Sequence, residues 1–170
     1  MIISIDLETT GLDPETCQIL EIGAVTSEGR EFHCYVDNGL IQGEPYALQM
    51  NQAILKKIAN NHLDLVSVKH VVSYFKGWLP EQWTATGKNF ASFDLPFLLR
   101  LPGWDIKVKH RIVDPGNLYW KPVFDGHCLP DLKTCMERAG IGGDVPHTAL
   151  EDAKIVLELV KRYYDSQNTA

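Results

Sequence analysis

The chain has 170 residues, of which 45% are hydrophobic and 22% are charged, and this suits a single globular domain, residues 1–170, with its own core. No apolar run approaches the ~18 residues of a membrane-spanning helix, so we expect no membrane-spanning segment. The net charge of −6 argues against a protein that coats long nucleic acids by counterion release, although bound divalent cations would still attract a phosphate.

Strands dominate the N-terminal part of the chain. Apolar and polar side chains alternate along residues 1–8, which predicts a half-buried strand. The Gly and Pro of residues 9–14 predict a turn after it. Residues 18–27 and 31–37 predict two more strands, and residues 28–30 form a short hairpin link between them.

Helices and strands alternate along the middle of the chain. Apolar residues at helical spacing predict helices around Ile54–Ile58 and Val68–Leu79. A strand is predicted at 83–87, and a helix follows at 93–101 with its proline in the first turn. A short strand is predicted at 110–113.

Two helices are predicted in the C-terminal part, over residues 129–139 and 148–164, and Gly140 ends the first of them. Three strands followed by alternating helices and strands favour an α/β fold. We expect a mixed β-sheet of about five strands, the first three antiparallel, with helices on its faces.

Asp6 and Glu8 are the first candidates for a functional site. They lie two residues apart on the first predicted strand, so both side chains point to the same face. Two ionised acids at this spacing repel each other, and a magnesium ion would remove the conflict because it prefers carboxylate and water oxygens. The alternative is a solvated strand end, and the two-residue motif alone does not decide between these interpretations.

Asp94 lies among almost entirely apolar neighbours in residues 89–98. An acid in such surroundings either satisfies amide groups at a helix start or binds a metal ion. Taken alone, Asp94 fits the helix start better, and it becomes a candidate ligand only together with the other acids.

The start of the last predicted helix holds a further group. Thr148-x-x-Glu151 matches a capping box, which makes Thr148 the expected N-cap and gives Glu151 a structural task. Asp152 then lies in the first helical turn, and His147 lies on the loop before it. Because the helix would start between His147 and Asp152, the His147 imidazole could move toward a site that Asp152 helps to form. The alternative for His147 is an exposed loop histidine without a function.

Together these residues supply what hydrolysis of a phosphodiester requires. Two metal ions ~3.5–4 Å apart activate water, reduce the charge on the phosphate and stabilise the leaving oxygen. They need several carboxylates as ligands and one base that is neutral near pH ~7–8, as histidine is. The residues that match this requirement are Asp6, Glu8, Asp94, His147 and Asp152.

Three stretches of the chain resemble the motifs of a known family. They are Asp6-Leu7-Glu8-Thr9-Thr10-Gly11-Leu12-Asp13, Asn89-x-x-x-Phe93-Asp94 and His147-x-x-x-x-Asp152. Their order and internal spacing are similar to those of the DEDDh group of DnaQ-like 3′–5′ exonucleases, in the RNase H-like superfamily. The resemblance covers nearly the whole chain, and it implies an RNase H-like sheet flanked by helices.

The resemblance also implies a role for each matching residue. The site would hold two Mg²⁺ ions, for which Mn²⁺ would substitute, and His147 would act as general base. The ligands of the two ions would be Asp6, Glu8, Asp94 and Asp152. The backbone at Thr9 would hold the terminal 3′-hydroxyl, Gly11 would let that loop approach closely, and Leu12 would wedge against the terminal base. Asn89 and Phe93 would line the path of the strand. Core packing explains Leu12 and Phe93 nearly as well.

The function implied by the resemblance is removal of nucleoside 5′-monophosphates from single-stranded or frayed 3′ ends of DNA. One alternative keeps the chemistry and changes the substrate to short RNA or RNA 3′ tails, as in oligoribonucleases. Another is a non-catalytic interaction module, which gains nothing from clustered acids. Cysteines 17, 34, 128 and 135 have neither C-x-x-C nor zinc-site spacing, so we expect reduced thiols and a cytoplasmic location. We expect a monomer or homodimer.

Overall fold

A five-stranded mixed sheet organises the protein. The computed structural model describes residues 1–168, and its strands lie in the order β4-β3-β2-β1-β5. The neighbours β1, β2 and β3 run antiparallel, whereas β5 is parallel to β1 and β4 is parallel to β3. This confirms the expected sheet. The strands are β1 (Ile2–Thr9), β2 (Ile19–Thr26), β3 (Glu31–Asp37), β4 (Leu65–Ser67) and β5 (Thr84–Thr86).

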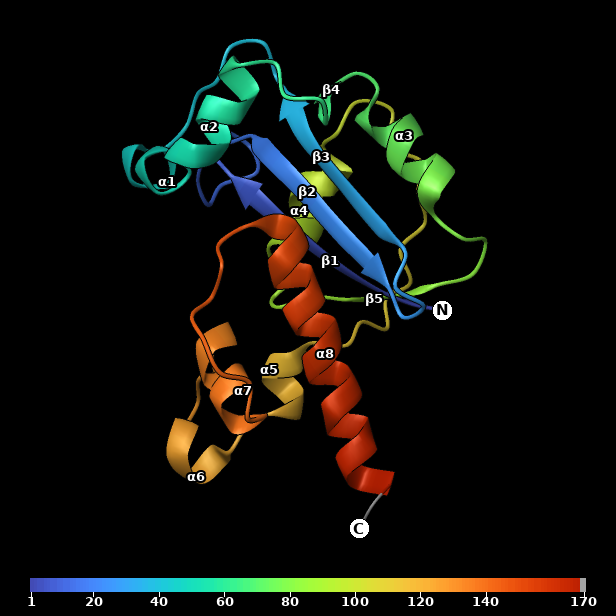
Figure 1. Ribbon diagram of the computed structural model, residues 1–170, viewed down its shortest axis with the longest axis vertical. Coiled ribbons are helices and arrows are strands. Elements are labelled where there is room, and N and C mark those ends of the chain that lie inside the picture. Colours follow the sequence, from blue (N-terminus) through green and yellow to red (C-terminus); the bar gives the residue numbers. More distant parts are fainter. Residues whose placement is uncertain (169–170) are drawn as a thin grey trace.

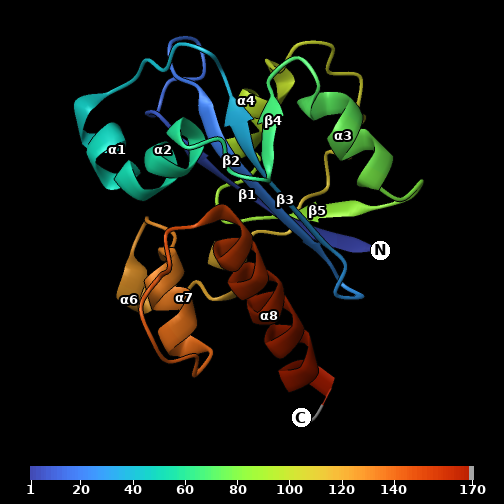
Figure 2. The same cartoon turned by 45° about the horizontal axis from the view of Figure 1, so that its top comes forward.

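Helices cover both faces of the sheet. The long helix α8 crosses the face formed by β1 and β2 (Figure 1), and α3 and α4 lie on the opposite face. Helices α1 and α2 lie together at one side of the sheet, and α6 and α7 lie beside α8 (Figure 2). The helices are α1 (Pro45–Met50), α2 (Gln52–Ala59), α3 (Val71–Trp78), α4 (Asp94–Leu99), α5 (Pro115–Leu118), α6 (Pro122–Asp125), α7 (Leu132–Arg138) and α8 (Ala149–Asn168).

Side chains along β1 point alternately into the main core and toward the candidate site. Ile3, Ile5 and Leu7 are buried in the main core, which α3 and α4 complete. Because neighbouring side chains point to opposite faces of a strand, Asp6 and Glu8 point instead to the face that α8 covers. Apolar packing between β2 and α8 holds that helix in place, and the residues involved are Val25, Ala153 and Leu157.

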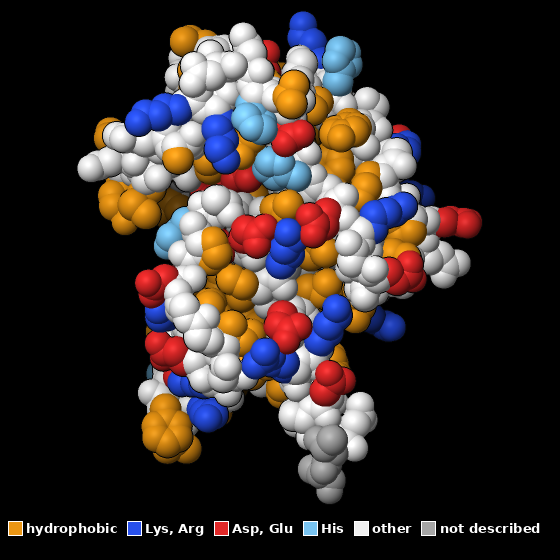
Figure 3. All heavy atoms as spheres, in the orientation of Figure 1, with side chains coloured by type: hydrophobic (Ala, Val, Ile, Leu, Met, Phe, Trp, Pro, Cys, Tyr) orange, Lys and Arg blue, Asp and Glu red, His pale blue; other side chains and the backbone are white. Residues whose placement is uncertain are grey.

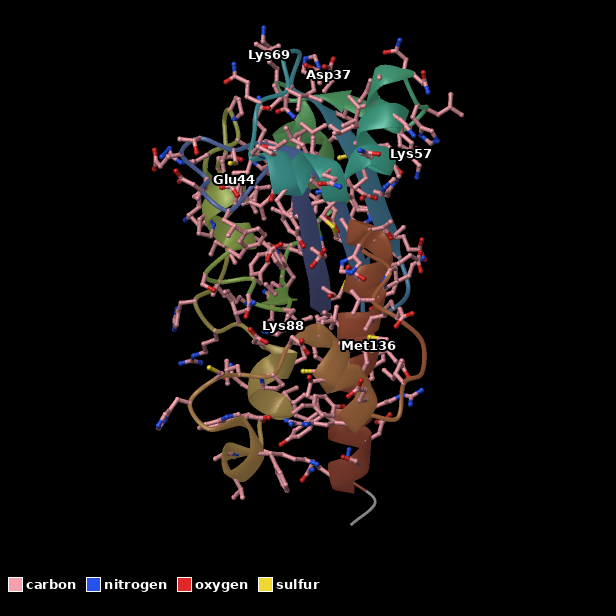
Figure 4. All side chains as sticks on the ribbon, turned by 90° about the vertical axis from the view of Figure 1, so that its left-hand side faces the viewer. Asp37, Glu44, Lys57, Lys69, Lys88 and Met136 are labelled. Atoms are coloured by element: carbon pink, nitrogen blue, oxygen red, sulfur yellow. The ribbon has the colours of Figure 1, made fainter. Side chains whose placement is uncertain are left out.

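Helix α7 and the loop after β5 connect this helical layer to the sheet. Figure 4 shows Met136 between α7 and α8, where it is 1% exposed. It also shows Lys88 between the sheet and the helices α5 and α7. The side chain of Lys88 lies 4.0 Å from Asp114, the N-cap residue of α5.

The predicted strand at 110–113 is wrong. Only Val113 pairs, in an isolated parallel bridge with Thr86. The pairing stops there because Asp114 caps α5 and Pro115 begins it, which turns the chain away from the sheet. The fifth strand is β4, whose three residues are too few to produce a visible alternation.

The predicted helices are present, but several begin or end elsewhere. Helix α7 starts after Pro130, because the Asp131 side chain accepts a hydrogen bond from the Thr134 N–H at 2.8 Å. Gly140 follows α7 with a positive φ of 69°, as predicted for a helix end. The short helices α1, α5 and α6, each beginning at a proline, carry no periodic signal and were not predicted. Among the described residues, no helix is long and apolar enough to cross a membrane.

Candidate active site

Three acids meet where β1 ends under the first turn of α8. Asp6 and Glu8 come from the strand and Asp152 comes from the helix, and each offers a carboxylate oxygen within 4.8 Å of the others. Asp152 is 5% exposed. The structure therefore brings together three of the four predicted ligands from opposite ends of the chain.

Asp94, the first residue of α4, lies beside this group and is 2% exposed. Its Oδ1 accepts a hydrogen bond from the Leu7 N–H at 3.0 Å. This bond holds the start of α4 against β1 between the two strand acids. Asp94 therefore lies in the first turn of a helix and also has a partner distant in sequence. Its negative charge raises the pKa of Asp6.

His147 lies on the exposed loop before α8, with a φ of +55°. This backbone conformation is uncommon for a residue with a side chain. The His147 backbone N–H donates a hydrogen bond to the Asp152 carboxylate. The candidate base is thus fixed beside a candidate ligand, while its imidazole stays accessible from solvent.

Helix α8 begins directly after Thr148, as predicted, but the reciprocal side-chain bonds of a capping box do not form. The Glu151 carboxylate accepts a hydrogen bond from Lys154 Nζ at 2.9 Å and does not reach back to Thr148. The first N–H of α8, that of Ala149, donates instead to Glu21 Oε2 on β2 at 3.2 Å. A side chain distant in sequence can replace a local cap when the helix start lies against a sheet.

Burial and mutual repulsion disfavour the charged form of every acid in the site. Burial, followed by the charges of Asp94 and Asp152, raises the pKa of Asp6 well above its ordinary value. Burial and then Glu21 raise the pKa of Glu8 to about 7. Burial likewise raises the pKa of Asp152 to about 6 and raises that of Asp94.

A divalent cation fits this arrangement. Oδ1 of Asp152 is buried and has no hydrogen-bond partner, so one ligand atom is left without a partner inside the protein. The cluster offers only carboxylate oxygens, which hard cations such as Mg²⁺ and Mn²⁺ prefer. Over α8, acidic and basic side chains alternate on the face in Figure 3, so the clustered acids are a local feature.

A cavity of about 260 Å³ opens next to Glu8. Leu12 on its rim is 74% exposed, so core packing does not account for this residue. Phe93 lies opposite and is partly buried against the main core. Glu44, labelled in Figure 4, contributes from the α1 side. The lining residues are Leu7, Glu8, Thr9, Gly11, Leu12, Glu44, Tyr46, Ala47, Met50, Asn51 and Phe93.

Backbone contacts shape the loop between Glu8 and this cavity. The Thr9 carbonyl accepts a hydrogen bond from Asn51 Nδ2 at 3.0 Å, and the Asn51 side chain also hydrogen-bonds Glu8. A Cβ on Gly11 would lie 2.5 Å from Cys17 Sγ and 2.7 Å from Glu44. A larger residue at position 11 would have to displace the side chains of Cys17 and Glu44, so glycine suits the close packing of this loop.

Asn89 lies outside the cavity lining. It has a positive φ of 59°, and its N–H donates to Asp114 Oδ2 at 2.8 Å. This bond fixes the loop that leads from β5 to Phe93 and Asp94. The structure thus separates Asn89 from the other predicted substrate contacts, all of which line the cavity.

Four residues beside the clustered acids were not predicted from the sequence: Glu21, Tyr46, Met50 and Asn51. The signal for Glu21 was a single acid within the apolar run 19–25. The two residues from α1 are exposed and apolar, at 74% for Tyr46 and 53% for Met50. Their helix shows no apolar periodicity, so nothing in the sequence places it beside β1.

The profile of one protein family, described as Exonuclease, matches residues 3–160. The chain belongs to this exonuclease family. Among curated relatives, a PolC-type DNA polymerase III from Thermotoga maritima is 27% identical over 96% of the chain, which spans only 12% of that polymerase. An oligoribonuclease from Aliivibrio fischeri is 25% identical, and the match covers 95% of the chain and 92% of the relative.

Solved structures of other exonucleases share the fold. Exonuclease I from Methylocaldum szegediense superposes with a TM-score of 0.71 at 15% identity, over 97% of this chain and 40% of that one. E. coli exonuclease I in complex with a dT13 oligonucleotide gives a TM-score of 0.70 at 16% identity, over 97% of this chain and 42% of the other. The mixed sheet and its helices are therefore the exonuclease fold of the RNase H-like type.

Proposed function

We propose that this member of the exonuclease family is a metal-dependent 3′–5′ exonuclease of the DEDDh type that acts mainly on single-stranded DNA. The observation that carries the proposal is the meeting of Asp6, Glu8 and Asp152 within 4.8 Å, with Asp94 and His147 beside them. A protein that only binds nucleic acid or another protein gains nothing from buried acids that repel one another.

The acids of the site would hold two divalent cations, Mg²⁺ or Mn²⁺. Asp6 is central, because the charges of Asp94, Asp152 and Glu8 all act on its carboxylate. This position would suit a ligand shared by both ions. Two bound cations supply charge neutralisation at the phosphate and make water more acidic. The chain itself supplies the ligands in fixed positions, so little reorganisation is needed when the ions bind.

His147 would accept the proton of the attacking water. The water oxygen forms a bond to phosphorus, and the bond between phosphorus and the 3′-oxygen of the penultimate nucleotide breaks. That 3′-oxygen takes up a proton. The products are a nucleoside 5′-monophosphate and a chain that is shorter by one nucleotide. Accessibility of His147 supports this role, because the proton must leave to solvent after each cycle.

The cavity beside Glu8 would receive the terminal nucleoside. The Thr9 backbone would hold the 3′-hydroxyl, and the exposed Leu12 would lie against the terminal base with Phe93 opposite. Tyr46 and Met50 extend the apolar wall on the α1 side. A cavity of about 260 Å³ favours one unpaired nucleotide at a time, so a frayed or single-stranded end is the expected substrate.

The direct test is digestion of a 5′-labelled DNA oligonucleotide in the presence of Mg²⁺ or Mn²⁺. We expect a ladder that shortens from the 3′ end and stops when EDTA is added. Asp6→Asn keeps the size of the side chain and removes its charge, and it should abolish the ladder, whereas Glu28→Gln in the exposed β2–β3 turn should not. A ladder that persists with EDTA or in Asp6→Asn would refute the proposal.

A second candidate is the same chemistry on short RNA. This candidate is favoured by the match to an oligoribonuclease, which is 25% identical over 95% of the chain. DNA and RNA oligomers of equal sequence and length, digested side by side, decide between them through kcat/KM. The single-domain organisation, the cytoplasmic location and the choice between monomer and homodimer stay predictions.

A further inference from the structure

Glu21 is a buried acid that the proposed chemistry does not use. It lies in the middle of β2, directly opposite Glu8 in the antiparallel register, and it is 1% exposed. Every other residue of β2 is buried too, and nearly all are apolar. Burial of a carboxylate is unfavourable unless hydrogen bonds satisfy its oxygens, so the place of Glu21 in this strand requires a reason.

Both carboxylate oxygens of Glu21 have defined partners. Oε2 accepts the Ala149 N–H of α8 at 3.2 Å, and Oε1 lies 2.7 Å from His33 Nε2 on β3. His33 Nδ1 in turn lies 3.4 Å from Asp64 Oδ2. Glu21 therefore connects the sheet and the surface histidine to the first turn of α8.

The contact depends on an unusually close approach of α8 to β2. A Cβ on Gly23 would lie 2.1 Å from the Leu150 nitrogen and 2.2 Å from the Ala149 carbonyl carbon. Gly23 lies two residues after Glu21, so both point to the same face. Glycine lets the helix start touch the strand, and Glu21 then reaches the first free N–H of that helix.

We propose that Glu21 is a positioning residue that fixes the first turn of α8, and with it the metal ligand Asp152 and the base His147. The bond to Ala149 lies two residues after His147 and three before Asp152. No local cap performs this task, because Glu151 pairs with Lys154. The hydrogen bond with His33 keeps the carboxylate extended toward α8.

The inference rests on the proposed function, because it takes Asp152 as a ligand and His147 as the base. Reach and charge are separable at this position. Glu21→Gln keeps the length and an oxygen that accepts from Ala149, but removes the charge. Glu21→Asp keeps the charge but shortens the side chain by one carbon, about 1.5 Å. If Glu21 acts by positioning, Glu21→Asp should lose more function than Glu21→Gln. If Glu21 acts through its charge, Glu21→Gln should lose more.

The experiment measures Mn²⁺ binding by calorimetry, kcat and KM on a DNA oligonucleotide, and hydrogen exchange of the Ala149 amide. Glu21→Gln keeps the bond to Ala149, so exchange at the Ala149 amide should be unchanged. The charge that it loses, which raises the pKa of Glu8 in the unchanged protein, should change the Kd for Mn²⁺ and kcat by a few-fold at most, less than the change in Glu21→Asp. Glu21→Asp should raise the Kd for Mn²⁺ about 10-fold and lower kcat roughly 10- to 100-fold. It should leave KM within about threefold, because the cavity is untouched, and speed exchange at Ala149.

Val25→Ala is the matched control for lost stability. Val25 lies on the same strand and packs against the same helix at Ala153 and Leu157, in the second and third turns. It should lower the unfolding temperature without changing the Kd for Mn²⁺ or exchange at Ala149. The inference is overturned if Glu21→Asp binds Mn²⁺ and cleaves as the unchanged protein does, or if Glu21→Gln loses as much as Glu21→Asp. If the unchanged protein neither binds Mn²⁺ nor cleaves, the proposed function itself has failed.

Discussion

Removing the charge of Glu8 should stabilise the metal-free protein while destroying its activity. Burial and the charges of Glu21 and Asp152 raise the pKa of Glu8 from 4.5 to about 7. Unfolding releases the group into water, where it ionises at its ordinary pKa. Ionisation of Glu8 therefore favours the unfolded state, and this penalty is fully present only above the raised pKa.

The magnitude follows from that shift. One pKa unit corresponds to ~1.4 kcal/mol, so Glu8→Gln should raise the free energy of unfolding by about 3 kcal/mol at pH 8. For a protein of this size that equals a rise in unfolding temperature of about 6–12 °C. At pH 4.5 the gain should shrink to about 0.4 kcal/mol, because Glu8 is then protonated in the folded protein and only about half ionised in the unfolded chain.

The assay is urea denaturation in EDTA at both pH values, repeated with Mg²⁺. Mg²⁺ should stabilise the unchanged protein at pH 8 and should have little effect on Glu8→Gln. Glu28→Gln, an exposed glutamate in the β2–β3 turn, should change stability by less than ~0.5 kcal/mol at either pH. Equal or lower stability of metal-free Glu8→Gln at pH 8 would refute the reasoning, because the acids would then not be in electrostatic conflict.

Three further predictions follow from the geometry. His147→Ala should lower kcat at least ~100-fold and leave Mn²⁺ affinity unchanged by calorimetry, and a parallel loss of affinity would argue against its role as base. Leu12→Ala should raise KM for a single-stranded oligonucleotide without lowering the unfolding temperature, since the side chain is 74% exposed. A marked drop in the unfolding temperature would indicate that Leu12 serves core packing and not substrate binding. Gly23→Ala should cost about 1–3 kcal/mol in urea denaturation, and unchanged stability would contradict the close approach of α8.

The sequence by itself determined the three antiparallel strands and β5, and it indicated the residues of the candidate site. Alternation along residues 1–8 placed Ile3 and Ile5 in the core and Asp6 and Glu8 on the other face, because strand periodicity is a local property of the backbone. The motif spacing then indicated Asp94, His147 and Asp152 together, since the chemistry needs several acids and one base near each other.

Only the tertiary structure decided how these residues are held. The expected side-chain cap at Thr148 is replaced by Glu21, which is distant in sequence, and Asp94 of α4 accepts a hydrogen bond from Leu7 of β1. The wall formed by Tyr46 likewise depends on a short helix without periodicity. Such contacts arise when segments far apart in the chain pack together, and one sequence records the residue types of both partners but not their pairing.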